Sequence, residues 1–235
     1  VTVKKSVQGA IHRLTEALDA EGANVSVVLL PCELDGGKNG ADDFICRHGP
    51  KAYAALEGIA RPAATRKGKH LCDWWKPEPT EPHHKALTAW TVFQGAYADR
   101  SSVGLYQWHG THWVRLGARS REALKRPLHQ WMDAMRWHRR GDSVIGSMVS
   151  EILARLQADQ WDPSGVMAFT NGTWRDGVFS TGHCRDDGLT FCFPFPYDAG
   201  AKCPLWHKFI GQTIGADDQI RLLRAALRWT LLPKD

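Results

Sequence analysis

The sequence lacks long apolar runs and has little cysteine. Its most continuous apolar stretch, residues 25–30, is far shorter than the roughly 20 residues that cross a bilayer, and no basic and apolar signal pattern opens the chain. We therefore expect a cytoplasmic protein without a membrane partner. Six cysteines in 235 residues, none of them in a C-x-x-C pair, exclude a disulfide scaffold and favour reduced thiols.

The motifs of two large enzyme classes are also missing. Lys38 follows glycines, but no Ser or Thr follows it, so no phosphate loop of the G-x-x-x-x-G-K-[ST] type is complete. No G-x-S-x-G nucleophile elbow is present. We therefore expect the chain by itself to have no self-contained active site and to be inactive as an enzyme.

The composition is that of a folded protein. Hydrophobic residues make up 43% of the chain and charged residues 23%, which is enough apolar material for a real core in one or two domains. The net charge is only +5. The positions of the basic residues therefore matter more than their total.

The first 60 residues predict a helix over residues 4–21, a strand over residues 25–30 and further helices beginning near Asp42 and Pro50. A continuous β-branched run such as 25–30 is typical of a strand buried on both faces of a parallel sheet. A lone parallel strand has unpaired backbone groups on both edges and needs neighbours. We therefore expect the start of the chain to be the end of a larger α/β domain.

A change of composition marks a linker. The chain is basic and rich in turn residues over 61–70, and it is rich in proline over 77–82. We place the linker at residues 63–88, between an N-terminal part at 1–62 and a second domain at 89–235. No repeat or low-complexity tract is present.

Beyond the linker the pattern becomes α+β. The predicted elements are a hairpin over 105–116, helices over 120–139 and 143–157, a hairpin over 166–179 around Asn171-Gly172, a strand over 190–195, and helices over 203–210 and 216–232. Pro127 is the position at which a kink or a split of the first of these helices is to be considered.

The basic residues gather in one segment. Between Arg115 and Arg140 the sequence has eight Lys and Arg against Glu122 and Asp133. Phosphates are the usual partners of such a surface, and Trp108, Trp113 and Trp137 are candidates for stacking on unpaired bases. The alternative is a solvated helix face with tryptophans in the core. The candidate phosphate contacts are Arg119, Arg121, Lys125, Arg126, Arg136, Arg139 and Arg140.

Metal-binding patterns are weak. His70-x-Cys72, His83-His84, and His183-Cys184 with Cys192 do not have the paired spacing of a structural zinc site. Acidic residues follow the predicted strand, where α/β domains place function, and clustered carboxylates bind Mg²⁺. Asp42 and Asp43 are therefore the candidate metal ligands, with helix capping as the plain alternative.

Two stretches resemble known families. Residues 10–60, with AIHRLTEALDAEGANVSVVLLP followed by GGKNGADDFICRHGPKAYAALEGIA, resemble the end of a TOPRIM-type primase domain. The catalytic Glu and Asp-x-Asp of such domains lie upstream of the matching part. Residues 166–232, with VMAFTNGTWRDGVF and LTFCFPFPYDAGAKCPLWHKFIGQTIGADDQIRLLRAALRWTLL, are similar to the N-terminal domain of poxvirus-, phage- and plasmid-type primase–helicases. That domain precedes a superfamily 3 helicase.

The resemblance implies a nucleic-acid-binding module that connects primase to helicase in DNA replication initiation. Single-stranded or primed DNA, the helicase domain of the same protein, and further copies in a hexamer would be its partners. ATP and Mg²⁺ would be needed only by the full-length protein.

Two alternatives stay open. One is a structural module that oligomerises or docks on the helicase through Ile220, Leu223, Leu227 and Leu231. The other is a Mg²⁺-dependent TOPRIM primase or nuclease that uses Asp42 and Asp43.

Overall fold

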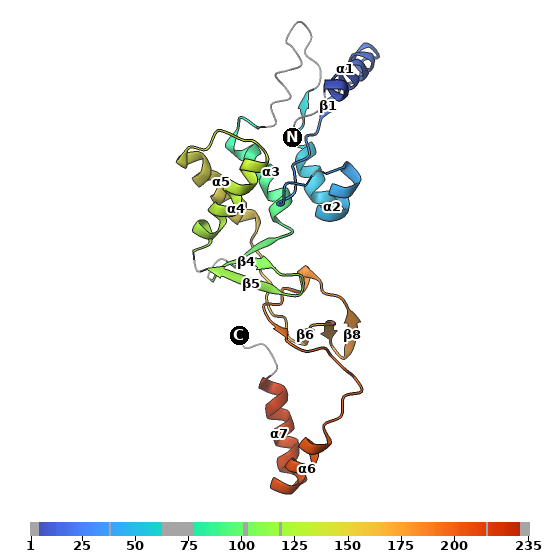
Figure 1. Ribbon diagram of the computed structural model, residues 1–235, viewed down its shortest axis with the longest axis vertical. Coiled ribbons are helices and arrows are strands. Elements are labelled where there is room, and N and C mark those ends of the chain that lie inside the picture. Colours follow the sequence, from blue (N-terminus) through green and yellow to red (C-terminus); the bar gives the residue numbers. More distant parts are fainter. Residues whose placement is uncertain are drawn as a thin grey trace. The chain divides into compact units, whose positions relative to one another are not determined.

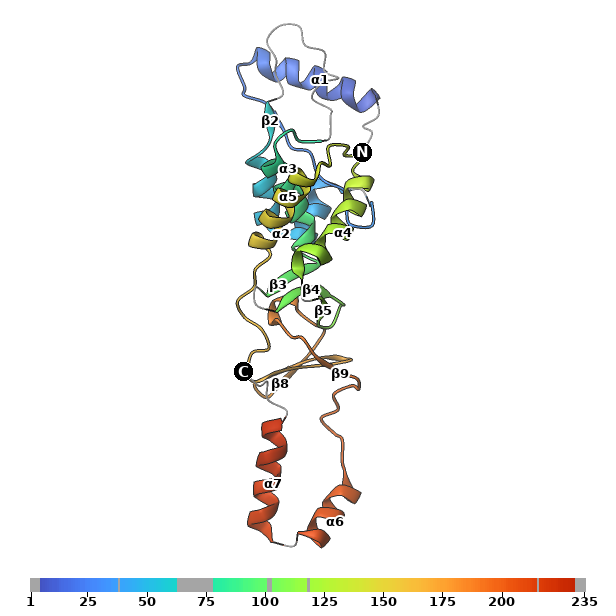
Figure 2. The same ribbon diagram turned by 90° about the vertical axis from the view of Figure 1, so that its left-hand side faces the viewer.

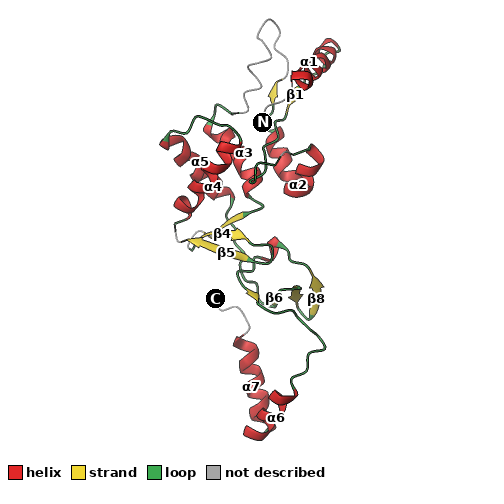
Figure 3. Ribbon diagram, viewed as in Figure 1, coloured by secondary structure: helices red, strands yellow, loops and turns green. Residues whose placement is uncertain are grey.

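The computed structural model describes residues 5–37, 39–62, 78–100, 103–117, 119–214 and 216–230. It confirms the predicted α+β class, with helices and short strands both present (Figure 3). The helices are α1 (Lys5–Ala20), α2 (Ala41–Glu57), α3 (Pro82–Phe93), α4 (Ser120–Ala134), α5 (Asp142–Arg155), α6 (Pro204–Thr213) and α7 (Asp217–Thr230), with a 3₁₀ turn at Arg185–Asp187. No helix among these residues combines the length and the apolar character that crossing a bilayer requires.

The strands form three small sheets (Figure 1). They are β1 (Ser26–Val27), β2 (Arg61–Pro62), β3 (Tyr97–Arg100), β4 (Gly104–Trp108), β5 (Trp113–Gly117), β6 (Val166–Phe169), β7 (Gly172–Arg175), β8 (Val178–Thr181) and β9 (Cys192–Phe193). The sheet orders are β1-β2, β3-β4-β5 and β8-β7-β6-β9.

The chain divides into two compact units. The helical unit comprises Val1–Gln107 and Leu116–Ala158, and the sheet unit comprises Trp108–Arg115 and Asp159–Asp235. Each unit is described by itself below.

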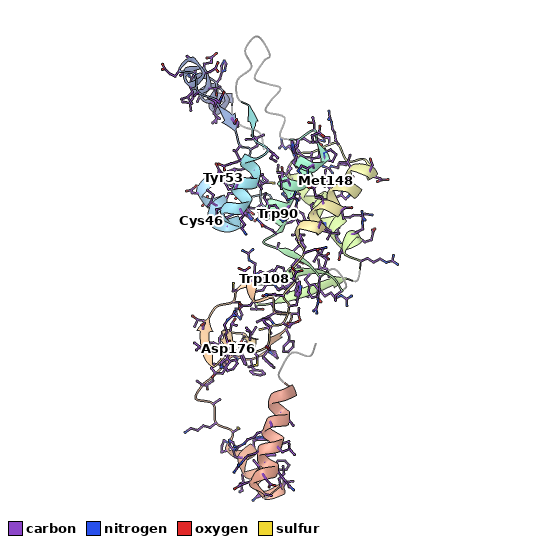
Figure 4. The ribbon with its side chains drawn as sticks, turned by 180° about the vertical axis from the view of Figure 1, so that it is seen from behind. Cys46, Tyr53, Trp90, Trp108, Met148 and Asp176 are labelled. Atoms are coloured by element: carbon purple, nitrogen blue, oxygen red, sulfur yellow. The ribbon has the colours of Figure 1, made fainter. Side chains whose placement is uncertain are left out.

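The helical unit has one core, built mainly from α2, α3, α4 and α5. α3 packs against both α2 and α5, and Figure 4 shows Trp90 of α3 between Tyr53 of α2 and Met148 of α5. The core contains residues from both sides of the predicted linker, with Phe44 and Leu56 buried together with Phe93 and Trp131. Residues 82–88 of that linker are helical, and residues 63–77 lie outside the described residues.

α2 is two helical segments joined at a kink. Gly49 has φ 81° and ψ 165°, a conformation that favours glycine, and Pro50 then opens the second segment. The predicted interruption at this position is confirmed. The kink lets residues before and after it, Phe44 and Ala52 among them, reach the same core.

The strand predicted over residues 25–30 is wrong in length and direction. β1 has only two residues, and it pairs antiparallel with β2, Ser26 opposite Pro62 and Val27 opposite Arg61. Val28 and Leu30 instead pack against the helical core. Burial of this apolar run therefore comes from helices, and the argument for parallel neighbouring strands loses its premise.

The sheet unit confirms the predicted Asn171-Gly172 hairpin. β6 pairs antiparallel with β7, and β9 joins the other edge of β6 in parallel. Gly172 has φ 156°, and a Cβ there would lie 2.2 Å from the carbonyl oxygen of Ser180. Only glycine fits this close approach. The small core contains Val166, Ala168 and Leu189.

The two predicted C-terminal helices are confirmed as α6 and α7. They follow one another through a short turn, from which they diverge in Figure 2. Ile210 is the buried residue of α6.

Candidate nucleic-acid interface

The apolar residues of α4 fix which of its basic residues reach solvent. Leu124, Leu128, Trp131 and Met132 are all fully buried, and their i, i+4, i+7, i+8 spacing defines one face of the helix. Pro127 lies inside α4 without ending it. Arg126 lies away from the buried face, is exposed, and has no hydrogen bond or ion pair within the described residues.

Two other cations of α4 are held by the protein itself. The guanidinium of Arg121 donates hydrogen bonds to the carbonyl oxygen of Gly146, at 3.3 Å, and to the hydroxyl of Ser150, both on α5. Lys125 pairs with Glu122 at 2.9 Å. Arg121 therefore joins α4 to α5, and Glu122 offsets the charge of Lys125, so both cations are less available to phosphate than the sequence implies.

Arg119 precedes α4 and is exposed. The pKa of the nearby Glu122 lies below its ordinary value, first because Lys125 donates a hydrogen bond to it and also because Arg119 and Arg121 add positive potential. Arg119 therefore adds to a positive field at the start of the helix.

The basic loop, Arg136–Arg140, follows α4. Its turn is fixed by two backbone hydrogen bonds, from Arg136 N to Asp133 O and from Trp137 N to Met132 O, both 3.0 Å long. Arg136 has φ 56°, in the left-handed region that glycine usually occupies at a helix end. Trp137 is fully buried, and its ring lies edge-on 5.0 Å from that of Trp131.

Glu78 and Lys85 hold the backbone of residues 138 and 139 of the basic loop in place. The Glu78 carboxylate accepts the backbone N–H groups of His138 and Arg139, each at 2.9 Å, and pairs with the Lys85 ammonium. Lys85 is 1% exposed and also donates to the carbonyl oxygen of Arg139 at 3.1 Å. Its ammonium lies 5.9 Å from the Trp137 ring centroid.

Burial by itself would raise the pKa of Glu78. The hydrogen bonds from Lys85, His138 and Arg139 outweigh burial and hold this pKa below the ordinary value of 4.5. The carboxylate is therefore charged near neutral pH and stays a strong acceptor for the loop backbone.

The arginine side chains of the basic loop differ in their exposure and in their partners. Arg140 donates to the carbonyl oxygen of Trp137 at 2.7 Å and pairs with Asp133. Arg136 and Arg139 have exposed side chains, and that of Arg139 has no ion pair within the described residues. Arg126 and Arg139 are thus the predicted contacts with the freest charge.

The predicted stacking tryptophans differ in exposure. In the sheet unit, Trp113 is 5% exposed, its ring contacts those of Trp108 and Trp161, and its indole N–H donates to the carbonyl oxygen of Arg185 at 2.9 Å. Trp108 is partly exposed (Figure 4). Trp137 belongs to the helical core. Of the three, only Trp108 is partly exposed, and the other two are buried.

The candidate metal residues lie at a helix start. Asp42 and Asp43 are exposed in the first turn of α2, where negative charge stabilises a helix N-terminus. No group of three or more His, Cys, Asp or Glu side chains suited to a metal ion occurs among the described residues. Cys72 and His70 lie outside these residues, and the cysteines within them are free thiols.

The Glu78–Lys85 pair is the part of this site that sequence reasoning missed. Lys85 shares the buried side of α3 with Ala89 and Val92, at i, i+4 and i+7 spacing. A lysine within such an apolar stripe is a signal of a paired, buried charge. The predicted linker, which reached residue 88, concealed that signal.

Comparison with known proteins identifies one family. A family model described as "D5 N terminal like" matches residues 4–215, which is most of the chain and includes the segment with TOPRIM resemblance. Neither the curated proteins nor the solved structures contain a match to this chain.

Proposed function

The chain belongs to the D5 N-terminal-like family, which occurs in D5-type primase–helicases of phages and poxviruses, and from this premise we propose that it is a nucleic-acid-binding connecting module. In this proposal it lies between the primase part and the superfamily 3 helicase of a mobile-element replication protein and acts in replication initiation. Its partners are single-stranded or primed DNA and the helicase domain of the same protein, which would supply ATP and Mg²⁺ chemistry.

The proposal rests on the hydrogen bonds that hold the backbone of the basic loop in place. A loop that serves only solvation does not need a buried lysine and a carboxylate to fix its backbone. Here Glu78 and Lys85 hold the backbone of residues 138 and 139 while the side chain of Arg139 stays in solvent. A fixed backbone limits the region that the exposed guanidinium group of Arg139 can reach, which lowers the conformational entropy lost when it binds phosphate.

The remaining predicted contacts have graded roles in this proposal. Arg126 and Arg139 contact phosphates directly, and Arg119 and Arg136 add to the positive field. Arg121, Lys125 and Arg140 chiefly hold their neighbours in place. We propose Trp108, and not Trp113, as a stacking residue, since Trp108 is partly exposed and Trp113 is buried.

The experiment is a titration of the full chain with labelled single-stranded DNA at several salt concentrations. We expect affinity to fall steeply with salt, and Arg126→Glu with Arg139→Glu to weaken binding for every sequence equally. Each lost phosphate contact lowers the slope of log affinity against log salt by about 0.7.

Arg13→Glu with Lys51→Glu, at exposed positions of α1 and α2, is the matched double charge reversal. Equal binding by the double variant and by this control would contradict the assignment of the basic residues. The triple reversal at Arg136, Arg139 and Arg140 tests the whole loop in the same way.

A second candidate function is docking. On α7, Leu222 is 72% exposed and Leu227 is 42% exposed. Exposed apolar side chains on one helix are typical of a surface that binds a partner. Ile220 and Leu223 are partly buried, and Leu231 lies outside the described residues. The module would then oligomerise or bind the helicase and barely touch DNA. Light scattering with and without DNA separates the two functions, because assembly without DNA binding favours docking.

A further inference from the structure

The start of α6 exposes aromatic side chains that none of the roles above uses. Trp206 is 46% exposed and Phe209 is 55% exposed, and their ring centroids lie 6.1 Å apart on successive turns of the helix. Leu205, beside them, is also exposed. Apolar area left in water is unfavourable in proportion to its size. Such a surface is typical of one that binds a partner.

Exposed cations lie in the segment that carries these rings and on the helix that follows it. Lys202 and Lys208 flank the segment that carries Trp206, and Arg221 and Arg224 lie one turn apart on α7. All four side chains are exposed, and none has a hydrogen bond or ion pair within the described part of the chain. This differs from α4, where Arg121 and Lys125 are held by protein groups.

The acidic residues nearby offset only part of this charge. Asp217 and Asp218 lie in the first turn of α7, and residues 202–224 have four Lys and Arg against these two Asp. Lys208 directly precedes Phe209 in the chain, and a short turn leads from α6, which has ten residues and is about 15 Å long, to α7 with Arg221 and Arg224.

We propose that α6 and the first half of α7 form a second binding surface for single-stranded nucleic acid. Trp206 and Phe209 stack on unpaired bases, and Lys202, Lys208, Arg221 and Arg224 contact the phosphates. The ligand class rests on the proposed function, but the residues are independent of the basic loop and belong to the other unit.

The charge pattern favours nucleic acid over a protein partner. Lysine is depleted at protein–protein interfaces, whereas a positively charged surface with aromatic rings is the usual design for single strands. A duplex is a poorer fit, because its bases already stack on one another and expose only their edges.

The first test uses the full chain with fluorescein-labelled oligothymidylate, followed by anisotropy over a range of salt. Trp206→Ala and Phe209→Ala are each expected to weaken binding by about five- to a hundredfold. Lys202→Ala with Lys208→Ala is expected to reduce the salt slope by about 1.4, since each phosphate contact on a single strand contributes about 0.7.

The matched control is Arg13→Ala with Lys51→Ala. It removes the same charge from two exposed positions on α1 and α2, and we expect its affinity and salt slope to stay close to those of the unaltered chain. If the control and the Lys202–Lys208 variant behave alike, the surface is not a specific contact and the inference is overturned.

Ultraviolet crosslinking of the unaltered chain to the same oligonucleotide gives a test that no folding defect can imitate. Trypsin places the two rings in different peptides, Cys203–Lys208 and Phe209–Arg221. We expect adducts in one or both peptides. Adducts confined to other peptides, with normal binding by Trp206→Ala, would overturn the inference.

The outcomes separate this inference from the proposed function. If the unaltered chain does not bind the oligonucleotide, both fail. If reversal of the basic loop weakens binding and the α6 variants do not, only this inference fails. If Trp206→Ala changes the molar mass in light scattering while affinity is unchanged, the surface binds protein and the inference is overturned. Loss of binding in the α6 variants alone supports it.

Discussion

Lys85 shows how a single buried charge controls the candidate interface. Its ammonium is almost inaccessible, and Glu78, the carbonyl of Arg139 and the ring of Trp137 are its surroundings. We expect Lys85→Ala to lower the free energy of unfolding by about 3–5 kcal/mol, because it leaves the Glu78 carboxylate without its partner. Urea unfolding measures this, with Lys51→Ala as a surface control expected within about 0.5 kcal/mol.

The same pair predicts a pH dependence. The folded-state pKa of Glu78 is lowered, so its contribution to stability is present above the ordinary value of 4.5 and is lost as the pH falls through the folded-state pKa. The part of the free energy of unfolding that is lost in acid should be smaller in Lys85→Ala. If this substitution lowers the free energy of unfolding by less than about 1 kcal/mol at neutral pH, the pair is solvated.

His112, in the sheet unit, is a histidine with a shifted pKa. Burial lowers its pKa below 6.5, and the positive potential of His109 and His183 lowers it further. Protonation of His112 therefore favours the unfolded chain. Above pH 6.5 this residue does not lower the free energy of unfolding, and below that value the free energy of unfolding decreases as the pH falls.

We expect His112→Gln to reduce the difference in stability between about pH 7.5 and about pH 5.5, measured by urea unfolding. His207→Gln, on exposed α6, is the control and should keep the full difference. An unchanged pH dependence in His112→Gln would assign the effect to another group.

At the scale of elements, periodicity predicted the helices whose apolar stripes are uninterrupted. α1, α4, α5, α6 and α7 lie where the sequence placed them, and the Asn171-Gly172 turn is a hairpin. α3 was missed because prolines precede it and Lys85 interrupts its apolar stripe. Residues 25–30 were misread because a short apolar run buries equally well against helices, and periodicity cannot separate the two cases.

At the end of α4, the residue that would best stabilise the fold differs from the residue that would best bind DNA. Arg136 has the left-handed conformation in which glycine is the usual residue, so Arg136→Gly should raise the free energy of unfolding by about 1 kcal/mol. The same change removes a cation from the basic loop and should weaken single-strand binding. Thermal unfolding and the DNA titration measure both effects. Arg139→Gly, without the backbone benefit, should weaken binding and not stabilise.

For the whole molecule, the sequence located the basic segment but not the state of its side chains. Seven cations between residues 119 and 140 read alike in one dimension. In the fold, Arg121 and Arg140 bind groups of the protein, while Arg126 and Arg139 have no ion pair within the described residues. Which arginine meets which acceptor depends on the packing of α4 against α5 and on Glu78, 60 residues away from His138. No local pattern contains that information.

The two units differ in how much apolar surface they bury, and hydrogen exchange should show it. α3, α4 and α5 share a large core, whereas α6 and α7 contribute little beyond Ile210. We expect slow exchange in the first group and fast exchange in the second, because opening costs less where few apolar contacts break. Added oligothymidylate should slow exchange at α6 and the start of α7. If those amides were already as protected in the free chain as those of α5, another part of the protein would cover the helix pair, and its rings would have no free face for a base.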